Sequence, residues 1–203
     1  MRNPWKASLL LVLLAALPSQ AQDNRLPQDE ARRFAKLCVE QTTLTDPQIK
    51  TDVDPDKACA EKGEGGGAMV IPDKKLSKEV IGKAEKEIVP VGQLWLRKWT
   101  TVVKGKPTPK DKLRVMTVKI DDKDRPMPLL LLGIRQTGEK DLELVVYAKD
   151  SEPQQVLPLK KLDQIQALPV DLEWQRGEKN VDSLTITIMG QFQAVLSITR
   201  QAD

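Results

Sequence analysis

The sequence predicts a mainly β fold, an antiparallel β-sandwich or barrel-like domain preceded by a small disulfide-stapled α-helical hairpin. Beyond residue 92, apolar and polar residues alternate along several short segments, as they do in strands with one buried face. Turn-forming residues separate these segments about every ten positions. Before them lie two segments with helical features, each containing one cysteine.

The N-terminus has the pattern of a secretory signal peptide. Two basic residues precede an apolar run over residues 7–17, which is shorter than the ~20 apolar residues that a membrane-spanning helix needs. Ser19 and Ala21 then supply the small residues of a signal-peptidase site, whereas an uncleaved membrane anchor is the alternative. We therefore predict a signal peptide at residues 1–21 and a secreted or periplasmic product with no membrane span after cleavage.

Two helix-like segments occupy residues 22–62. In the first, residues 27–42, apolar residues recur at spacings of three and four on one face. Asp54 offers an N-cap and Pro55 suits a first helical position, so a second short helix should begin there and end at Gly63. The apolar face of the first helix comprises Ala31, Phe34, Leu37 and Cys38.

The two cysteines, Cys38 and Cys59, fall one on each predicted helix. Export would place them in a compartment where disulfides persist, so we expect them to pair and to staple the helical hairpin. A reactive free thiol, the alternative, needs a basic or cationic neighbourhood that the local sequence does not show.

A glycine-rich stretch at residues 63–67 marks the predicted boundary. Because glycine imposes little local structure, we interpret this stretch as a linker between the hairpin and an antiparallel β domain at residues 68–203. That domain should open with a short strand at residues 68–71. In residues 73–88 apolar positions are spaced by four, which favours a helix although Gly82 weakens it.

The rest of the β domain is predicted as a series of short strands. Period-two alternation marks residues 168–174, 184–188 and 192–198. Residues 129–132 are apolar on both faces, so their strand, at 129–135, is expected in the centre of a sheet. The remaining strands are expected at residues 93–103, 113–120, 142–149 and 156–160.

Trp95 and Trp99 are the candidate ligand-binding residues. On one continuous strand they would share a face, and an exposed face of this kind forms an aromatic platform that stacks sugar rings. The competing interpretation places them in the core, because a large aromatic side chain buries about 150–250 Å² when it is packed.

Composition excludes several kinds of chemistry. The chain contains no histidine, which removes the commonest general base and the imidazole metal ligand. Asp52, Asp54 and Asp56 resemble the start of a calcium loop, but the glycine and glutamate required further along are absent, so helix capping explains them better. We predict no catalytic residue, no metal site and no cofactor.

The charge balance indicates no nucleic-acid partner. The chain has 32 basic and 29 acidic residues, and two of the basic ones lie in the predicted signal peptide. The remainder is close to neutral, whereas binding to nucleic acid draws on a dense basic face.

These observations predict an exported, non-catalytic binding or structural module of the periplasm or cell surface. Its partner would be a protein or polysaccharide of the envelope. One alternative is a carbohydrate-binding module that uses Trp95 and Trp99. The other is a histidine-free hydrolase with paired carboxylates, since two acids about 5–9 Å apart can come from anywhere in a chain.

Overall fold

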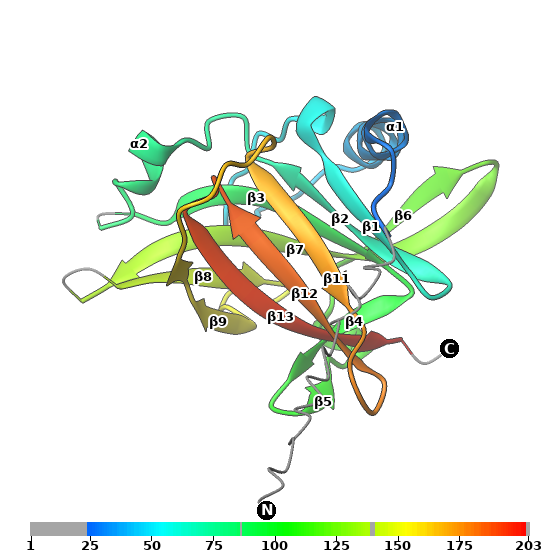
Figure 1. The fold of residues 1–203 in the computed structure, drawn as a ribbon. Helices are drawn as coiled ribbons and strands as arrows, with labels where there is room; N and C mark the ends of the chain where they lie inside the picture. Colours follow the sequence, from blue (N-terminus) through cyan, green and yellow to red (C-terminus); the bar gives the residue numbers. More distant parts are fainter. Residues whose placement is uncertain (1–23, 86, 139–140, 202–203) are drawn as a thin grey trace, which may run out of the picture.

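Two antiparallel β-sheets pack face to face in the computed structural model, which describes residues 24–85, 87–138 and 141–201 (Figure 1). The predicted signal peptide at residues 1–21 lies outside the described residues. The first sheet has the order β1-β2-β3-β7-β8-β9, with β6 beside β7, and the second has the order β11-β12-β13-β4-β5, with β10 beside β13. The prediction of an antiparallel, mainly β fold is confirmed, and its form is a sandwich of two sheets rather than a closed barrel.

The bounds of the elements follow the chain order. The first sheet comprises β1 (Cys59–Gly63), β2 (Gly66–Pro72), β3 (Val89–Arg97), β6 (Val115–Ile120), β7 (Lys123–Thr137), β8 (Asp141–Tyr147) and β9 (Gln155–Pro158). The second comprises β4 (Trp99–Val103), β5 (Lys106–Pro107), β10 (Lys160–Lys161), β11 (Val170–Gln175), β12 (Val181–Ile188) and β13 (Phe192–Arg200). The helical elements are α1 (Gln28–Glu40), η1 (Pro55–Lys57), α2 (Lys78–Ile81) and η2 (Lys110–Lys112).

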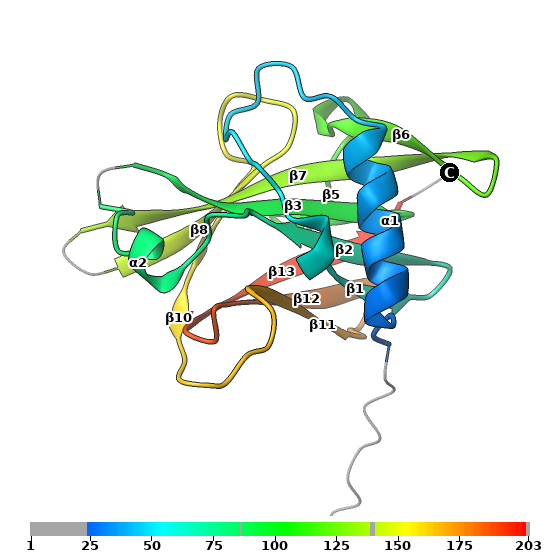
Figure 2. The same cartoon turned by 90° about the horizontal axis from the view of Figure 1, so that it is seen from above.

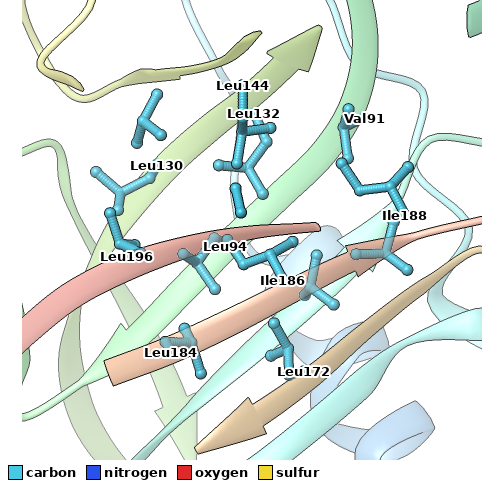
Figure 3. Close-up of a cluster of buried hydrophobic side chains, with 14 of the residues drawn as sticks. Val91, Leu94, Leu130, Leu132, Leu144, Leu172, Leu184, Ile186, Ile188 and Leu196 are labelled. Atoms are coloured by element: carbon cyan, nitrogen blue, oxygen red, sulfur yellow. The ribbon is translucent and has the colours of Figure 1, made fainter. Parts of the chain in front are cut away.

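The main hydrophobic core lies between the two sheets (Figure 3). Its side chains come from alternate positions of each strand, because successive residues of a strand point to opposite faces. Ile186 of β12 is fully buried in this core, whereas Glu173 and Val195, which flank Thr185 of β12 on the outer face, are exposed. Core members labelled in Figure 3 include Leu94, Leu130, Leu132, Leu172, Leu184 and Leu196.

Strand β7 is the central strand that the apolar run predicted. It pairs with β3 on one side and with β8 on the other. Leu130 and Leu132 point into the core between the sheets, while Leu129 and Leu131 point to the outer face. That outer face is also covered, so all four leucines are fully buried.

Helix α1 covers part of the outer face of the first sheet (Figure 2). Ala31, Ala35 and Cys38 on its apolar side are buried against β2 and β3. Small residues at two of these positions let the helix axis approach the sheet closely. The helix predicted at residues 27–42 is therefore confirmed, at Gln28–Glu40. The carbonyl of Pro27 accepts hydrogen bonds from the first free amides of the helix, those of Glu30 and Ala31.

The second predicted helix is wrong. Asp54 does act as an N-cap, since its side chain accepts a hydrogen bond from the amide of Asp56 at 3.1 Å, but only the single 3-10 turn η1 follows. Strand β1 then begins at Cys59. Its alternating side chains are buried on both faces, and its edge is paired with the segment around Leu26, whose amide donates to the carbonyl of Ala60.

The predicted disulfide is also not supported. Cys38 and Cys59 are both free and buried. Cys38 packs between α1 and the outer face of the first sheet, whereas Cys59 packs in the core between the sheets. The two thiols therefore lie on opposite faces of the first sheet and do not form a disulfide bond.

The glycine-rich stretch at residues 63–67 forms a β-hairpin instead of the expected linker. Gly63 pairs with Gly66 in the β1–β2 ladder, so residues on both sides of the stretch belong to one sheet. A Cβ added to Gly63 would lie 2.6 Å from the ring of Trp174, and one added to Gly66 would lie 2.1 Å from the carbonyl oxygen of Arg97 and 2.8 Å from the ring of Trp99. These glycines are required because the hairpin backbone touches two buried indoles.

The helix expected at residues 73–88 is reduced to the single turn of α2. Ser77 caps it by accepting a hydrogen bond from the amide of Val80 at 3.2 Å. The apolar residues Leu76, Ile81 and Ala84 still reach the core between the sheets. Of the residues spaced by four, Leu76 and Ala84 are thus buried in the core and Val80 packs against it, although no long helix forms.

Candidate functional site

A groove lies between α1 and the β6–β7 hairpin on the outer face of the first sheet. Its volume is about 170 Å³. We call it the α1 groove and define it by the apolar and the charged residues that line it. The apolar lining includes Phe34, Cys38, Met69, Trp95, Ile120 and Met127, and the charged residues of the lining are Glu30, Glu61, Lys62 and Arg97.

The floor of the α1 groove is set by the strand register. Met69 of β2 lies opposite Trp95 of β3, so both side chains point toward α1. The indole nitrogen of Trp95 donates to Oε1 of Gln93 at 3.2 Å, which satisfies the polar edge of a ring that is only 1% exposed. The remaining ring surface and the flexible methionine give an adaptable apolar floor.

Gln41, which directly follows α1, joins the helix to β6. Oε1 of Gln41 accepts a hydrogen bond from the amide of Lys119 at 2.7 Å, and Nε2 of Gln41 donates to the carbonyl of Lys119 at 3.1 Å. The amide side chain thus pairs with β6 as a neighbouring strand would. This contact ties α1 to the hairpin that forms the opposite wall.

Two cationic side chains flank the mouth of the α1 groove. Lys62, Gly67 and Arg97 are adjacent in the register of β1, β2 and β3, so they share the face on which α1 packs. Glu30 of α1 approaches Lys62 at 4.0 Å. Arg97 is exposed and makes no ion pair within the described parts of the chain.

The two thiols are chemically inert in this environment. Burial raises the pKa of Cys38, which lines the α1 groove, to about 12. Burial likewise raises the pKa of Cys59 to about 12, although Arg25 opposes the shift. Cys59 donates a hydrogen bond to Asp171 at 3.2 Å, and Asp171 pairs with Arg25 at 2.7 Å. Neither cysteine is therefore a thiolate nucleophile at neutral pH.

Trp95 and Trp99, the predicted ligand platform, are not brought together. The backbone of Lys98 has a φ of 61°, and this residue separates β3 in the first sheet from β4 in the second. Trp95 consequently faces α1, while Trp99 faces the core and is 5% exposed. The two indoles form no common exposed surface, and their burial agrees with the core interpretation.

The acidic residues that resembled a calcium loop are held by cations of the protein. Within residues 24–85, 87–138 and 141–201, no group of three or more histidine, cysteine, aspartate or glutamate side chains is arranged to hold a metal ion. Asp52 pairs with Lys74 at 2.8 Å, Asp54 with Lys57 at 3.3 Å, and Asp56 with Lys36 at 3.1 Å.

Two buried carboxylates have structural hydrogen bonds. Asp73 accepts from the amides of Asp52 and Lys75, which fixes the turn after β2. Asp182 accepts from the indole nitrogen of Trp174 at 2.9 Å and from the amide of Gly177 at 3.1 Å. These hydrogen bonds use both carboxylates to hold local structure.

Sequence reasoning missed the α1 groove. The amphipathic pattern of α1 predicted that Phe34 and Cys38 face apolar surroundings, and Met127 precedes the apolar run of β7. No local signal places β6 beside α1, because that contact joins Gln41 to Lys119 across a long stretch of chain. The sequence thus indicated that each wall is apolar, but it did not indicate that the two walls lie side by side.

No protein-family model, curated protein or solved structure matches this chain. Among the helices that the structure describes, none is long and apolar enough to cross a membrane.

Proposed function

We propose that this protein is an exported, non-catalytic binding module that holds a small ligand in the α1 groove. The observation that carries the proposal is the groove itself, a mostly apolar opening of about 170 Å³ whose lining includes four charged residues. Concave, mostly apolar sites with a few polar groups are the usual form of small-molecule sites. The signal-peptide pattern of residues 1–21 supports export.

The chemistry of the described residues favours binding over catalysis. The chain has no histidine, and burial keeps both thiols protonated at neutral pH. The buried carboxylates of Asp73 and Asp182 accept hydrogen bonds that hold a turn and an indole. A nucleophile or general base would instead need an activating partner beside an open site.

Methyl NMR of the full chain without its signal peptide tests the proposal, because methionines mark the groove. Met69 and Met127 line it, whereas Met189 lies in the β12–β13 turn and does not. With ¹³C-methyl methionine labelling, 1-hexanol should shift the Met69 and Met127 signals and leave that of Met189 unchanged. Shifts that are equal at all three methyl groups, or absent, would refute binding in the α1 groove.

A matched pair of variants on β6 locates the bound probe. Ile120 lines the groove, so Ile120→Trp should fill it and remove the hexanol-induced shifts. Val115 lies on the other face of the same strand and is 43% exposed, so Val115→Trp should retain them. Equal binding by the two variants would contradict the assignment.

A further inference from the structure

We infer that the ligand of the α1 groove is a small amphipathic anion, with its apolar part inside the groove and its anionic group at Arg97. This inference rests on the proposed function and adds the ligand's size, charge and orientation. Three features carry it: the volume of the groove, the charges at its mouth and the position of Gly67.

The volume limits the apolar part of the ligand. A cavity of about 150 Å³ lined by apolar side chains accommodates a benzene ring. The α1 groove, at about 170 Å³, therefore fits one ring or about six carbon atoms.

The charges at the mouth select an anion. Lys62 is partly neutralised by Glu30 at 4.0 Å, but Arg97 has no anionic partner among the described residues. Its guanidinium can donate two parallel hydrogen bonds to a carboxylate or a similar anion. A cationic ligand would meet Arg97 and Lys62 at the same place and would be repelled.

Gly67 connects the charged mouth to the apolar floor. It lies between Lys62 of β1 and Arg97 of β3 in the strand register, and the same ladder places Met69 opposite Trp95 two positions further along β2. A Cβ on Gly67 would approach the carbonyl oxygen of Glu61 to 2.7 Å, so the backbone geometry keeps this position free of a side chain. Because Gly67 lines the groove without a side chain, none projects from this position between Arg97 and the apolar floor.

Three six-carbon probes with the same tail test the inference: hexanoate, 1-hexanol and hexylamine. Titrations followed by the Met69 and Met127 methyl signals give their dissociation constants for the full chain without its signal peptide. We expect hexanoate to bind roughly fivefold more tightly than hexylamine at low salt, with 1-hexanol between them, and the difference to shrink as salt screens the exposed charge.

Charge-reversal variants assign the preference to Arg97. Arg97→Glu should weaken the binding of hexanoate roughly fivefold, so that hexylamine binds more tightly than hexanoate. The affinity of Arg97→Gln for hexanoate should lie between those of Arg97→Glu and the native protein. Lys98→Glu is the matched control, because this neighbouring exposed cation does not line the groove. It should change hexanoate binding by less than about twofold. Unchanged methyl spectra of the free variants would show that each one folds.

The outcomes separate the two proposals. Equal binding of the three probes in the groove would overturn the anion preference and leave the binding module intact. An unchanged order of probes in Arg97→Glu would also overturn it. Failure of every probe to shift Met69 and Met127 would overturn the proposed function together with this inference.

Discussion

The indole rings of Trp99 and Trp174 meet edge to face, with ring centroids 4.7 Å apart and an interplanar angle of 81°. The β1–β2 hairpin lies against both rings, and its glycines replace side chains that would collide with them. An aromatic pair of this geometry adds stability beyond the area it buries. The glycine-rich sequence and the two distant tryptophans are therefore parts of one packing arrangement.

The first prediction is that Gly63→Ala destabilises the protein by about 1–3 kcal/mol, because the new methyl group overpacks the ring of Trp174. The control is Gly82→Ala at the end of α2, where a Cβ would have 3.3 Å to its nearest neighbour. It should cost less than about 0.5 kcal/mol. Urea denaturation measures both, and similar losses would mean that the hairpin does not lie on the indole.

The contrast between predicted and observed structure has a physical explanation. The alternation of apolar and polar residues predicted β12 and β13 correctly, because one face of each strand is buried and the other is polar or partly exposed. It failed for β1, where Cys59, Ala60 and Glu61 are all buried and the preceding Asp54 and Pro55 mimic a helix start. This segment forms a strand because it pairs with β2 and with the segment around Leu26. The local sequence of residues 59–63 indicates neither contact.

The second prediction concerns the free thiols. The native protein should resist iodoacetamide at pH 8, because a thiol with a pKa of about 12 is a thiolate in only about one molecule in 10⁴. After unfolding without reductant, both Cys38 and Cys59 should be alkylated. Peptide mapping by mass spectrometry reads out both states. If alkylation of the unfolded protein required prior reduction, Cys38 and Cys59 would be disulfide-bonded and the prediction would be wrong.

The same pKa shift predicts a loss of stability at alkaline pH. Burial raises the pKa of the Cys38 thiol from its ordinary value of 9.0 to about 12 in the folded protein, so the unfolded chain loses its thiol proton first as pH rises. Stability should be complete below pH ~9 and fall between pH ~9 and ~12, by about 1 kcal/mol at pH 10. Cys38→Ala should reduce this pH dependence in urea denaturation, whereas an unchanged slope would contradict the shift.

The fourth prediction concerns the contact between Gln41 and β6. Gln41→Ala removes both hydrogen bonds to Lys119 and should cost about 1 kcal/mol. Amide hydrogen exchange at Lys119 should accelerate, because its N–H loses its acceptor. In Gln41→Glu an acceptor remains, so exchange at Lys119 should stay slower than in Gln41→Ala. Equal exchange in the two variants would contradict the contact.

The last prediction concerns Lys98, the residue at which the chain passes from the first sheet to the second. A φ of 61° is costly for a residue with a Cβ and most costly for a β-branched residue, but glycine adopts it freely. Lys98→Gly should therefore be neutral or stabilise the protein by up to about 1 kcal/mol, whereas Lys98→Val should destabilise it by about 1–2 kcal/mol. Valine favours extended strands, so a regular strand through this position would give the opposite order. Such a strand would turn Trp99 to the outer face, because a shift of one residue exchanges the faces of all following side chains. Urea denaturation of the two variants distinguishes these arrangements.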